Sequence, residues 1–198
     1  MKNIIFDIGN VLLEFKPFEF LLKHYDEKTM EDLMVIIFSS DEWIEMDLGT
    51  MSVQEVKSRF INRNPQYENE IHYVLDHWSE MLVPIQNNIK FVKILKEKDY
   101  NLYLLSNFPL KAFEEVFNKY DFFKYFDGQV ISAYEHVIKP DEKIYNNLLE
   151  KYNLKPSECL FIDDMEANIL TAKELGMKTI CLSYKVDLEE KLKAIGIL

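Results

Sequence analysis

Cysteine is scarce in this sequence, and long apolar segments are absent. Only two cysteines occur among 198 residues, Cys159 and Cys181, and each lies within an apolar run. Two such thiols do not make the dense disulfide framework of a small secreted domain, so we expect both to be reduced and buried. No uncharged apolar stretch is long enough to cross a bilayer, and no signal-peptide core precedes the first predicted strand. These features predict a cytoplasmic protein.

Basic residues are too few to balance the acidic ones. Lysine and arginine total 23 against 34 aspartates and glutamates, which gives a formal net charge of −11. No basic stripe can neutralise a nucleic-acid backbone or an anionic membrane, so we expect neither partner. A phosphorylated ligand would therefore need a metal ion and a few local donors. The 48% of hydrophobic residues suffices for one full core and a smaller accessory domain.

Five short β-rich runs recur along the chain, separated by segments with helical spacing. The runs cover residues 3–6, 102–105, 129–131, 160–162 and 179–182. Apolar residues at helical spacing lie between them, for example in 111–120 and 145–152. Gly176 stands where the glycine that ends a helix belongs. Apolar strands that alternate with helices predict an α/β fold with a Rossmann-like, doubly wound parallel sheet.

The alternation is interrupted between Phe15 and Val83. This region has several helical segments, one of them starting with the capping box Ser52 to Glu55, and no convincing strand. We interpret residues 15–83 as an α-helical cap domain inserted after the first strand, with residues 1–14 and 84–198 forming the core. No low-complexity linker flanks the insertion, so we expect the cap to pack on the core.

Polar residues follow several of the predicted strands. A carboxylate at the end of an apolar strand is costly to bury unless a partner or a cation compensates for it. The carboxyl ends of parallel strands share one edge of the sheet, where α/β proteins bind ligands. Clustered carboxylates bind Mg²⁺, lysine and hydroxyl groups hold phosphoryl oxygens, and an ionised aspartate can act as a nucleophile. The residues expected at this edge are Asp7, Ser106, Asn107, Lys139, Asp163 and Asp164.

Four segments, in this order, resemble the motifs of the haloacid dehalogenase superfamily: FDIGNVLLEF, LLSNFP, IKPDEKIY and FIDDMEANI. The resemblance spans nearly the whole chain, and the position of the helical insertion also matches. Within the superfamily the sequence is similar to bacterial sugar-phosphate phosphatases of the glucose-1-phosphate phosphatase group. This implies hydrolysis of small phosphomonoesters, chiefly sugar phosphates, through an aspartyl-phosphate intermediate with Mg²⁺ as cofactor. We expect the partner to be a small phosphorylated metabolite and the protein to be a monomer or homodimer.

The resemblance also implies metal-site roles for matching residues. Asp7 would be both the nucleophile and a metal ligand, and Asp164 and the backbone carbonyl of Gly9 would complete the protein ligands of Mg²⁺. Asp163 would support the metal shell. Asn168 stands where many relatives carry a further acid.

The remaining matches imply contacts with the substrate. Lys139 would bridge the phosphoryl group and Asp7, which makes it both catalytic and substrate-binding. Ser106 would bind phosphoryl oxygens, with Asn107 beside it.

Gly9 departs from the pattern of most phosphatases in this superfamily. They carry a second aspartate there, which protonates the leaving group and later activates water. Loss of a positioned acid and base costs about 10²–10⁴-fold in rate. We therefore expect a preference for esters with acidic leaving groups, namely sugar 1-phosphates, acyl phosphates and aryl phosphates. Glu14 is a candidate substitute, although a hinge or solvated position suits it better.

Three other functions are compatible with these motifs. A haloacid dehalogenase-type hydrolase would use the same nucleophile without metal, although such relatives usually carry a tyrosine in place of Gly9. A non-catalytic phosphometabolite-binding protein would hold its ligand without turnover. A phosphotransferase or mutase would keep the phosphoryl group in its product. Magnesium dependence, halide release and product analysis distinguish these functions.

Overall fold

The computed structural model describes residues 1–183 and 186–198. Its core is a five-stranded, all-parallel sheet with the strand order β5-β4-β1-β6-β7. This confirms the predicted fold class, and each strand overlaps one of the predicted apolar runs. The strands are β1 (Asn3–Phe6), β4 (Asn101–Ser106), β5 (Gly128–Ile131), β6 (Cys159–Asp163) and β7 (Lys178–Cys181).

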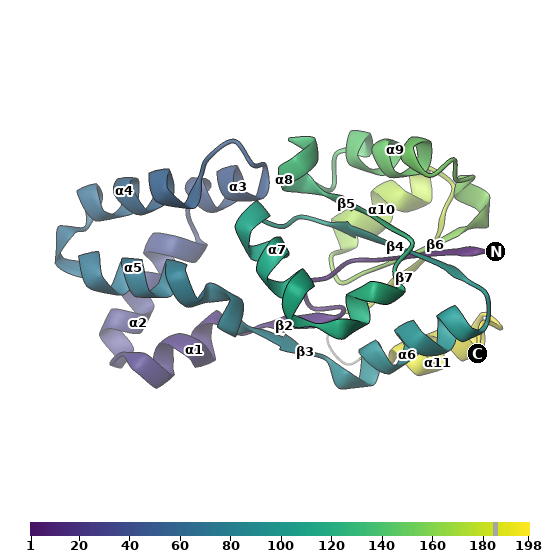
Figure 1. The fold of residues 1–198 in the computed structure, drawn as a ribbon, viewed down its shortest axis with the longest axis horizontal. Coiled ribbons are helices and arrows are strands. Elements are labelled where there is room, and N and C mark those ends of the chain that lie inside the picture. Colours follow the sequence, from purple (N-terminus) through teal and green to yellow (C-terminus); the bar gives the residue numbers. More distant parts are fainter. Residues whose placement is uncertain (184–185) are drawn as a thin grey trace.

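Successive side chains of the central strands point to opposite faces of the sheet. Ile5 belongs to the apolar cluster that includes residues of α9 (Glu142–Lys151) and α10 (Glu166–Glu174). Ile4 and Phe6 belong to the cluster that includes residues of α6 (Gln86–Glu97) and α11 (Leu188–Ala194). Figure 1 shows α9 and α10 on one side of the sheet and α6 and α11 on the other. Because both faces are covered, the strands are apolar without polar alternation.

The connections between strands place all their carboxyl ends at one edge of the sheet. After β4 the chain forms α7 (Leu110–Lys119) and a 3₁₀ turn (Asp121–Tyr125), and after β5 it forms the short α8 (Ser132–Glu135). A second 3₁₀ turn (Pro156–Glu158) precedes β6. The strand order reverses at β1, which lies between β4 and β6. A reversal of this kind opens a crevice at the carboxyl ends of the strands.

A helical segment, Pro17–Met81, lies at the end of the molecule opposite both termini, and we call it the cap (Figure 1). Its α4 begins with the predicted capping box, because Ser52 Oγ accepts from Glu55 N and Ser52 N donates to Glu55 Oε2. Its helices are α1 (Pro17–His24), α2 (Glu27–Leu33), a π-helical turn (Met34–Phe38), α3 (Asp41–Asp47), α4 (Val53–Arg63), a 3₁₀ turn (Pro65–Tyr67), α5 (Glu68–His77) and a final 3₁₀ turn (Trp78–Met81).

Two short strands join the cap to the core. β2 (Leu13–Phe15) pairs antiparallel with β3 (Leu82–Pro84), so that Leu13 lies opposite Pro84 and Phe15 opposite Leu82. The expectation of no strand between Phe15 and Val83 is therefore wrong at both ends. Strands of three residues are too short to show a periodic pattern, which explains the error. The predicted division of core and cap stays a prediction, and its boundaries fall within this ribbon.

None of the helices in residues 1–183 and 186–198 combines the length and the apolar character that crossing a membrane requires.

Candidate active site

The carboxyl ends of three neighbouring strands bring the first predicted site residues together. Asp7 directly follows β1, Ser106 ends β4, and Asp163 ends β6. The strand register places Phe6 of β1 beside Leu104 on one side and Ile162 on the other. Side chains that are far apart in the sequence therefore meet in the crevice at the carboxyl ends of the strands.

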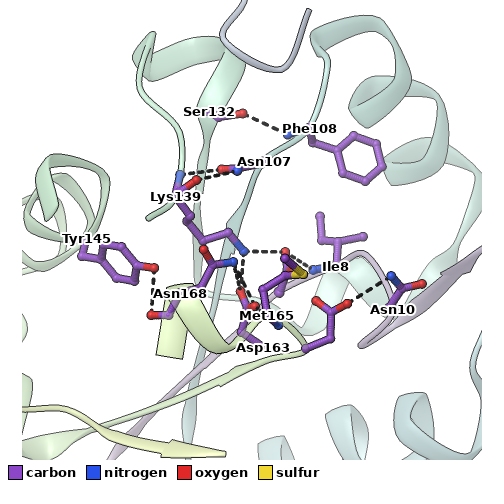
Figure 2. Close-up of polar contacts among 12 residues, drawn as sticks. Ile8, Asn10, Asn107, Phe108, Ser132, Lys139, Tyr145, Asp163, Met165 and Asn168 are labelled. Atoms are coloured by element: carbon purple, nitrogen blue, oxygen red, sulfur yellow. Dashed lines mark hydrogen bonds and ion pairs between the residues drawn. The ribbon is translucent and has the colours of Figure 1, made fainter. Parts of the chain in front are cut away.

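Lys139 forms a buried ion-pair network with two aspartates. Its Nζ lies 2.9 Å from Asp7 Oδ1 and 2.6 Å from Asp163 Oδ2. Only 3% of Lys139 and none of Asp163 is exposed. Burial alone would lower the pKa of Lys139, but the carboxylates of Asp7 and Asp163 outweigh it and raise this pKa above its ordinary value. The ammonium group therefore stays charged near neutral pH. Figure 2 shows Lys139 with its contact to Asp163.

Both carboxylate oxygens of Asp163 are occupied by protein donors. Oδ1 accepts from Met165 N at 2.8 Å and from Asn168 Nδ2 at 3.0 Å, while Oδ2 accepts from Lys139 Nζ. Figure 2 shows these contacts, together with the hydrogen bond from the Tyr145 hydroxyl to the backbone carbonyl of Asn168. Asp163 thus fixes Lys139 and the start of α10, which agrees with a supporting role. Asn168 supplies a donor where many relatives carry an acid.

Asp7 keeps one carboxylate oxygen available. Its Oδ1 accepts from Ile8 N at 2.7 Å and is the atom that faces Lys139, which leaves Oδ2 to the crevice. Burial raises the pKa of Asp7 to about 6, against the effect of Lys139 and with a further contribution from Asp163. A cation beside Asp7 would favour the ionised, nucleophilic form.

Asp164 is half-buried at the same edge. Its Oδ2 accepts from Asn10 Nδ2 at 3.1 Å, and burial raises its pKa while this hydrogen bond opposes the change. One carboxylate oxygen each from Asp7, Asp163 and Asp164 lie within 4.8 Å of one another. Because Asp163 is already engaged by donors, Asp7 and Asp164 are the better ligands. Such oxygen donors fit Mg²⁺, a hard cation that also takes backbone carbonyls.

Gly9 follows Asp7 by two residues in the first motif and lines a cavity of about 140 Å³. Within residues 1–183 and 186–198, no heavy atom lies within 4 Å of a Cβ atom built at this position. The space that the missing aspartate would occupy is therefore open. Glu14, the substitute considered from the sequence, is exposed on β2 and lies 3.0 Å from Lys16 Nζ.

Ser106 and Asn107 differ in what their side chains can do. Ser106 is 1% exposed, and its Oγ makes no hydrogen bond of normal geometry in the described ranges, although its interaction with Asp7 lowers the pKa of that carboxyl. A buried hydroxyl without a hydrogen-bond partner is unfavourable unless a bound ligand supplies that partner. Asn107 instead makes two hydrogen bonds with the backbone of Lys139. Lys139 N donates to Asn107 Oδ1 at 2.7 Å, and Asn107 Nδ2 donates to Lys139 O at 3.0 Å. We infer that Asn107 positions Lys139. The substrate contact expected from the sequence stays a prediction, and Asn107 also lines the cavity beside Gly9.

Sequence reasoning missed Asp47, the last residue of α3. Asp47 lines a cavity of about 140 Å³ together with Gly9, Asn10 and Asn107. Burial raises the pKa of Asp47 to about 7, with a contribution from Asp7 and against the effect of Lys139. One sequence feature points to Asp47: it is an acid in the last turn of a predicted helical segment, where the helix dipole disfavours a negative charge. The cavity walls also carry the aromatic residues Phe15, Trp43, Trp78 and Phe108.

Comparisons with known proteins identify the family of this chain. The family model of haloacid dehalogenase-like hydrolases matches residues 1–176. A phosphorylated carbohydrates phosphatase from Thermotoga maritima is 26% identical over 91% of this chain and 84% of its own length. A sesquiterpene phosphatase from Aspergillus oryzae is 25% identical over 89% of this chain and 87% of its own length.

Solved structures show the same fold in enzymes of two chemistries. A HAD family enzyme from Bacteroides thetaiotaomicron, in complex with magnesium and inorganic phosphate, superimposes with a TM-score of 0.74 at 21% identity, covering 96% of this chain and 98% of that one. The L-2-haloacid dehalogenase from Xanthobacter autotrophicus, with chloropropionic acid covalently bound, gives a TM-score of 0.69 at 14% identity, covering 100% and 84%. At these identities the likeness concerns the fold.

Proposed function

The chain belongs to the haloacid dehalogenase-like hydrolase family, and we propose that it is a Mg²⁺-dependent phosphomonoesterase that acts on small phosphorylated metabolites, with sugar phosphates as the first substrates to test. One observation carries this proposal. The ammonium group of Lys139 lies between Asp7 and Asp163, and the strand next to Asp7 ends in the buried Ser106 hydroxyl, which makes no hydrogen bond of normal geometry in the described residues. A phosphoryl group provides the acceptors that these donors need.

In the proposed reaction, Asp7 Oδ2 attacks phosphorus and the bond from phosphorus to the ester oxygen breaks. Lys139 and Ser106 donate to the phosphoryl oxygens and stabilise the charge that spreads over them. Water then cleaves the aspartyl phosphate, which restores Asp7 and releases inorganic phosphate. Mg²⁺ held by Asp7, Asp164 and the Gly9 carbonyl would supply positive charge that offsets carboxylate and phosphoryl repulsion.

The relatives and the cavity support a small substrate. A relative named for phosphorylated carbohydrates covers most of the chain, and a neighbour with the same fold holds magnesium and phosphate. The cavity beside Gly9 has a volume of about 140 Å³ and walls that include Trp43 and Trp78. Aromatic walls with a few polar groups suit the apolar face of a sugar ring or a short alcohol.

The test is phosphate release from aryl phosphates, sugar phosphates and apolar alkyl phosphates, each with Mg²⁺ or with EDTA. We expect release that requires Mg²⁺ and that Asp7→Asn abolishes. Asp121→Asn, which changes an aspartate whose side chain is 98% exposed, is the matched control and should leave release unchanged. Halide release without Mg²⁺ would favour the dehalogenase alternative. A product that retains the phosphoryl group would favour a phosphotransferase or mutase. Tight phosphate binding without any release would favour a binding protein.

A further inference from the structure

We propose that the cap supplies the general acid and base of this reaction through Asp47, in place of the aspartate that position 9 lacks. This inference rests on the proposed function. It assigns to one residue of α3 the proton transfers to the leaving oxygen and from the attacking water.

The position of Asp47 supports this role. Asp47 and Gly9 line the same cavity, and Asn107 beside Lys139 lines it as well. Among the residues that the structure describes, none has an atom within 4 Å of a Cβ atom placed on Gly9, so the space beside the backbone there is open. Asp47, on the cap, is the residue with a carboxyl side chain among those described as lining this cavity.

The core holds this part of the cap in place. The Ser132 hydroxyl of α8 donates to the backbone carbonyl of Asp47 and accepts from Phe108 N at 2.9 Å. The next residue, Leu48, offers its carbonyl to His136 Nδ1 at 3.0 Å. One buried serine thus connects the end of α3 to the loop that follows β4.

Gly49, the residue after Leu48, also packs against the core, at the backbone of Ala133 in α8. Its φ of +66° is in the left-handed region, and a Cβ atom there would lie 2.2 Å from the backbone oxygen of Ala133. Only glycine allows the turn after α3 to approach α8 this closely. The backbone of 47–49 is therefore docked on the core, as a proton donor positioned for reaction requires.

The protonation of Asp47 also suits this role. Asp47 ends α3, whose last turn carries no basic residue, so the negative end of the helix dipole disfavours its ionised form. Burial and the carboxylate of Asp7 act in the same direction, and Lys139 opposes them, which leaves a pKa of about 7. A carboxyl group of this pKa can donate and recover a proton near neutral pH.

Other charged groups on the elements around α3 are engaged elsewhere. On α3 and α4, Glu42 pairs with Arg63, and on α8 His136 faces the carbonyl of Leu48. The π-helical turn Met34–Phe38 contains no titratable side chain. Glu45, on α3 itself, is bound to the Thr50 hydroxyl. The charges acting on Asp47 are thus Asp7 and Lys139.

The proton transfers balance over two steps. As Asp7 attacks and the ester bond to phosphorus breaks, the leaving oxygen takes the bond electrons and the proton of Asp47, and the alcohol departs. The Asp47 carboxylate then takes a proton from water as the water oxygen attacks the phosphorus of the aspartyl phosphate. The acyl phosphate bond breaks, Asp7 and phosphate are released, and Asp47 is again protonated.

The test compares Asp47→Asn with wild type on two classes of ester. With alkyl phosphates, whose leaving groups need a proton, we expect kcat to fall by about 10²–10⁴-fold. With 4-nitrophenyl phosphate, whose leaving group does not, we expect a burst of nitrophenol close to one equivalent of enzyme, followed by slow turnover. The burst reports an aspartyl-phosphate intermediate that accumulates because no base activates water. Loss of a purely structural residue does not produce such a burst.

Two further variants complete the test. Asp41→Asn makes the same change at an exposed position of α3 and should keep wild-type kinetics. Gly9→Asp in the Asp47→Asn background places a carboxyl group in the open space, and we expect it to restore alkyl-ester turnover at least tenfold. The wild type should lose kcat for alkyl esters above about pH 7, where Asp47 ionises, and Asp47→Asn should lack this dependence.

An equal loss for both ester classes without a burst would overturn the role of Asp47 while leaving the phosphatase proposal intact. A wild-type enzyme that releases no phosphate from any ester, with or without Mg²⁺, would overturn both.

Discussion

Ser132 donates its hydroxyl to the backbone carbonyl of Asp47, so a side chain of the core fixes the last residue of a cap helix. The hydroxyl oxygen of Ser132 accepts from Phe108 N, and Ser132 is completely buried. We expect Ser132→Ala to lower the free energy of unfolding by about 1–3 kcal/mol, because it leaves a buried N–H and C=O without partners. Denaturant unfolding measures this change, and catalytic assays should show a loss of kcat in parallel. Full stability and full activity would contradict the bridging role.

Gly49→Ala should separate the cap from the core, because the new methyl group would meet the backbone of Ala133. Gly196→Ala is the matched control, since Gly196 also has a positive φ, of +72°, but no neighbour within 4 Å. Both variants should lose about 1 kcal/mol or more from backbone strain. Only Gly49→Ala should also change the intrinsic fluorescence of the two tryptophans, Trp43 and Trp78, which lie in the cap and line the cavity. Identical spectra for the two variants would exclude the predicted displacement.

Ser106→Ala should separate activity from stability. The Ser106 hydroxyl is buried and makes no hydrogen bond of normal geometry within residues 1–183 and 186–198, so its removal relieves an unsatisfied group and should keep or slightly raise the melting temperature. Phosphate release should nevertheless fall by about tenfold or more, because a donor to the phosphoryl group is lost. Thermal unfolding and steady-state kinetics on the same preparation test both statements. A clear loss of stability would show that the hydroxyl has a structural partner.

Mg²⁺ should stabilise the folded protein through Asp164. A ligand present at about one hundred times its dissociation constant adds about 2.7 kcal/mol to the free energy of unfolding. We expect the melting temperature to rise with Mg²⁺ in the wild type and to be insensitive to Mg²⁺ in Asp164→Asn. Asp121→Asn should keep the wild-type response. An unchanged Mg²⁺ response in Asp164→Asn would remove this residue from the ligand set.

The raised pKa of Asp47 also predicts how stability depends on pH. The native carboxyl keeps its proton up to about pH 7, whereas the unfolded one loses it near the ordinary value of 3.8. The folded state then binds more protons between these values, so Asp47 lowers stability as the pH rises through this window. Asp47→Asn removes the effect and should gain up to about 4 kcal/mol relative to wild type at pH 8 compared with pH 4. Chemical denaturation at both pH values, with Asp41→Asn as control, measures the difference.

Substrate preference distinguishes an enzyme that lacks a general acid from one in which Asp47 supplies it. If position 9 leaves the enzyme without an acid, esters with acidic leaving groups should be strongly preferred. If Asp47 supplies the proton, wild type should hydrolyse alkyl phosphates well, and only Asp47→Asn should show that preference. The ratio of activities on 4-nitrophenyl and alkyl phosphates in the two proteins decides between them.

The sequence predicts the parts of this structure that depend on local patterns. Apolar runs predict all five sheet strands, and acids at strand ends predict the edge where Asp7 and Asp163 meet. The pairing of Asn107 with the backbone of Lys139 depends on a contact between segments 32 residues apart, which no local pattern encodes. Asp47 belongs to the same category, because its role follows from how the cap docks on the core.

The paired strands β2 and β3 have one more consequence. Leu13 faces Pro84 and Phe15 faces Leu82, and Lys16 N donates to Met81 O just beyond them. In topological terms the whole cap is the loop of a single β-hairpin. Its two connections to the core are hydrogen-bonded to each other, so they form one joint between cap and core. The same arrangement makes the cap an exchangeable module: a tight turn in place of residues 17–81 closes the hairpin without breaking a strand of the core sheet.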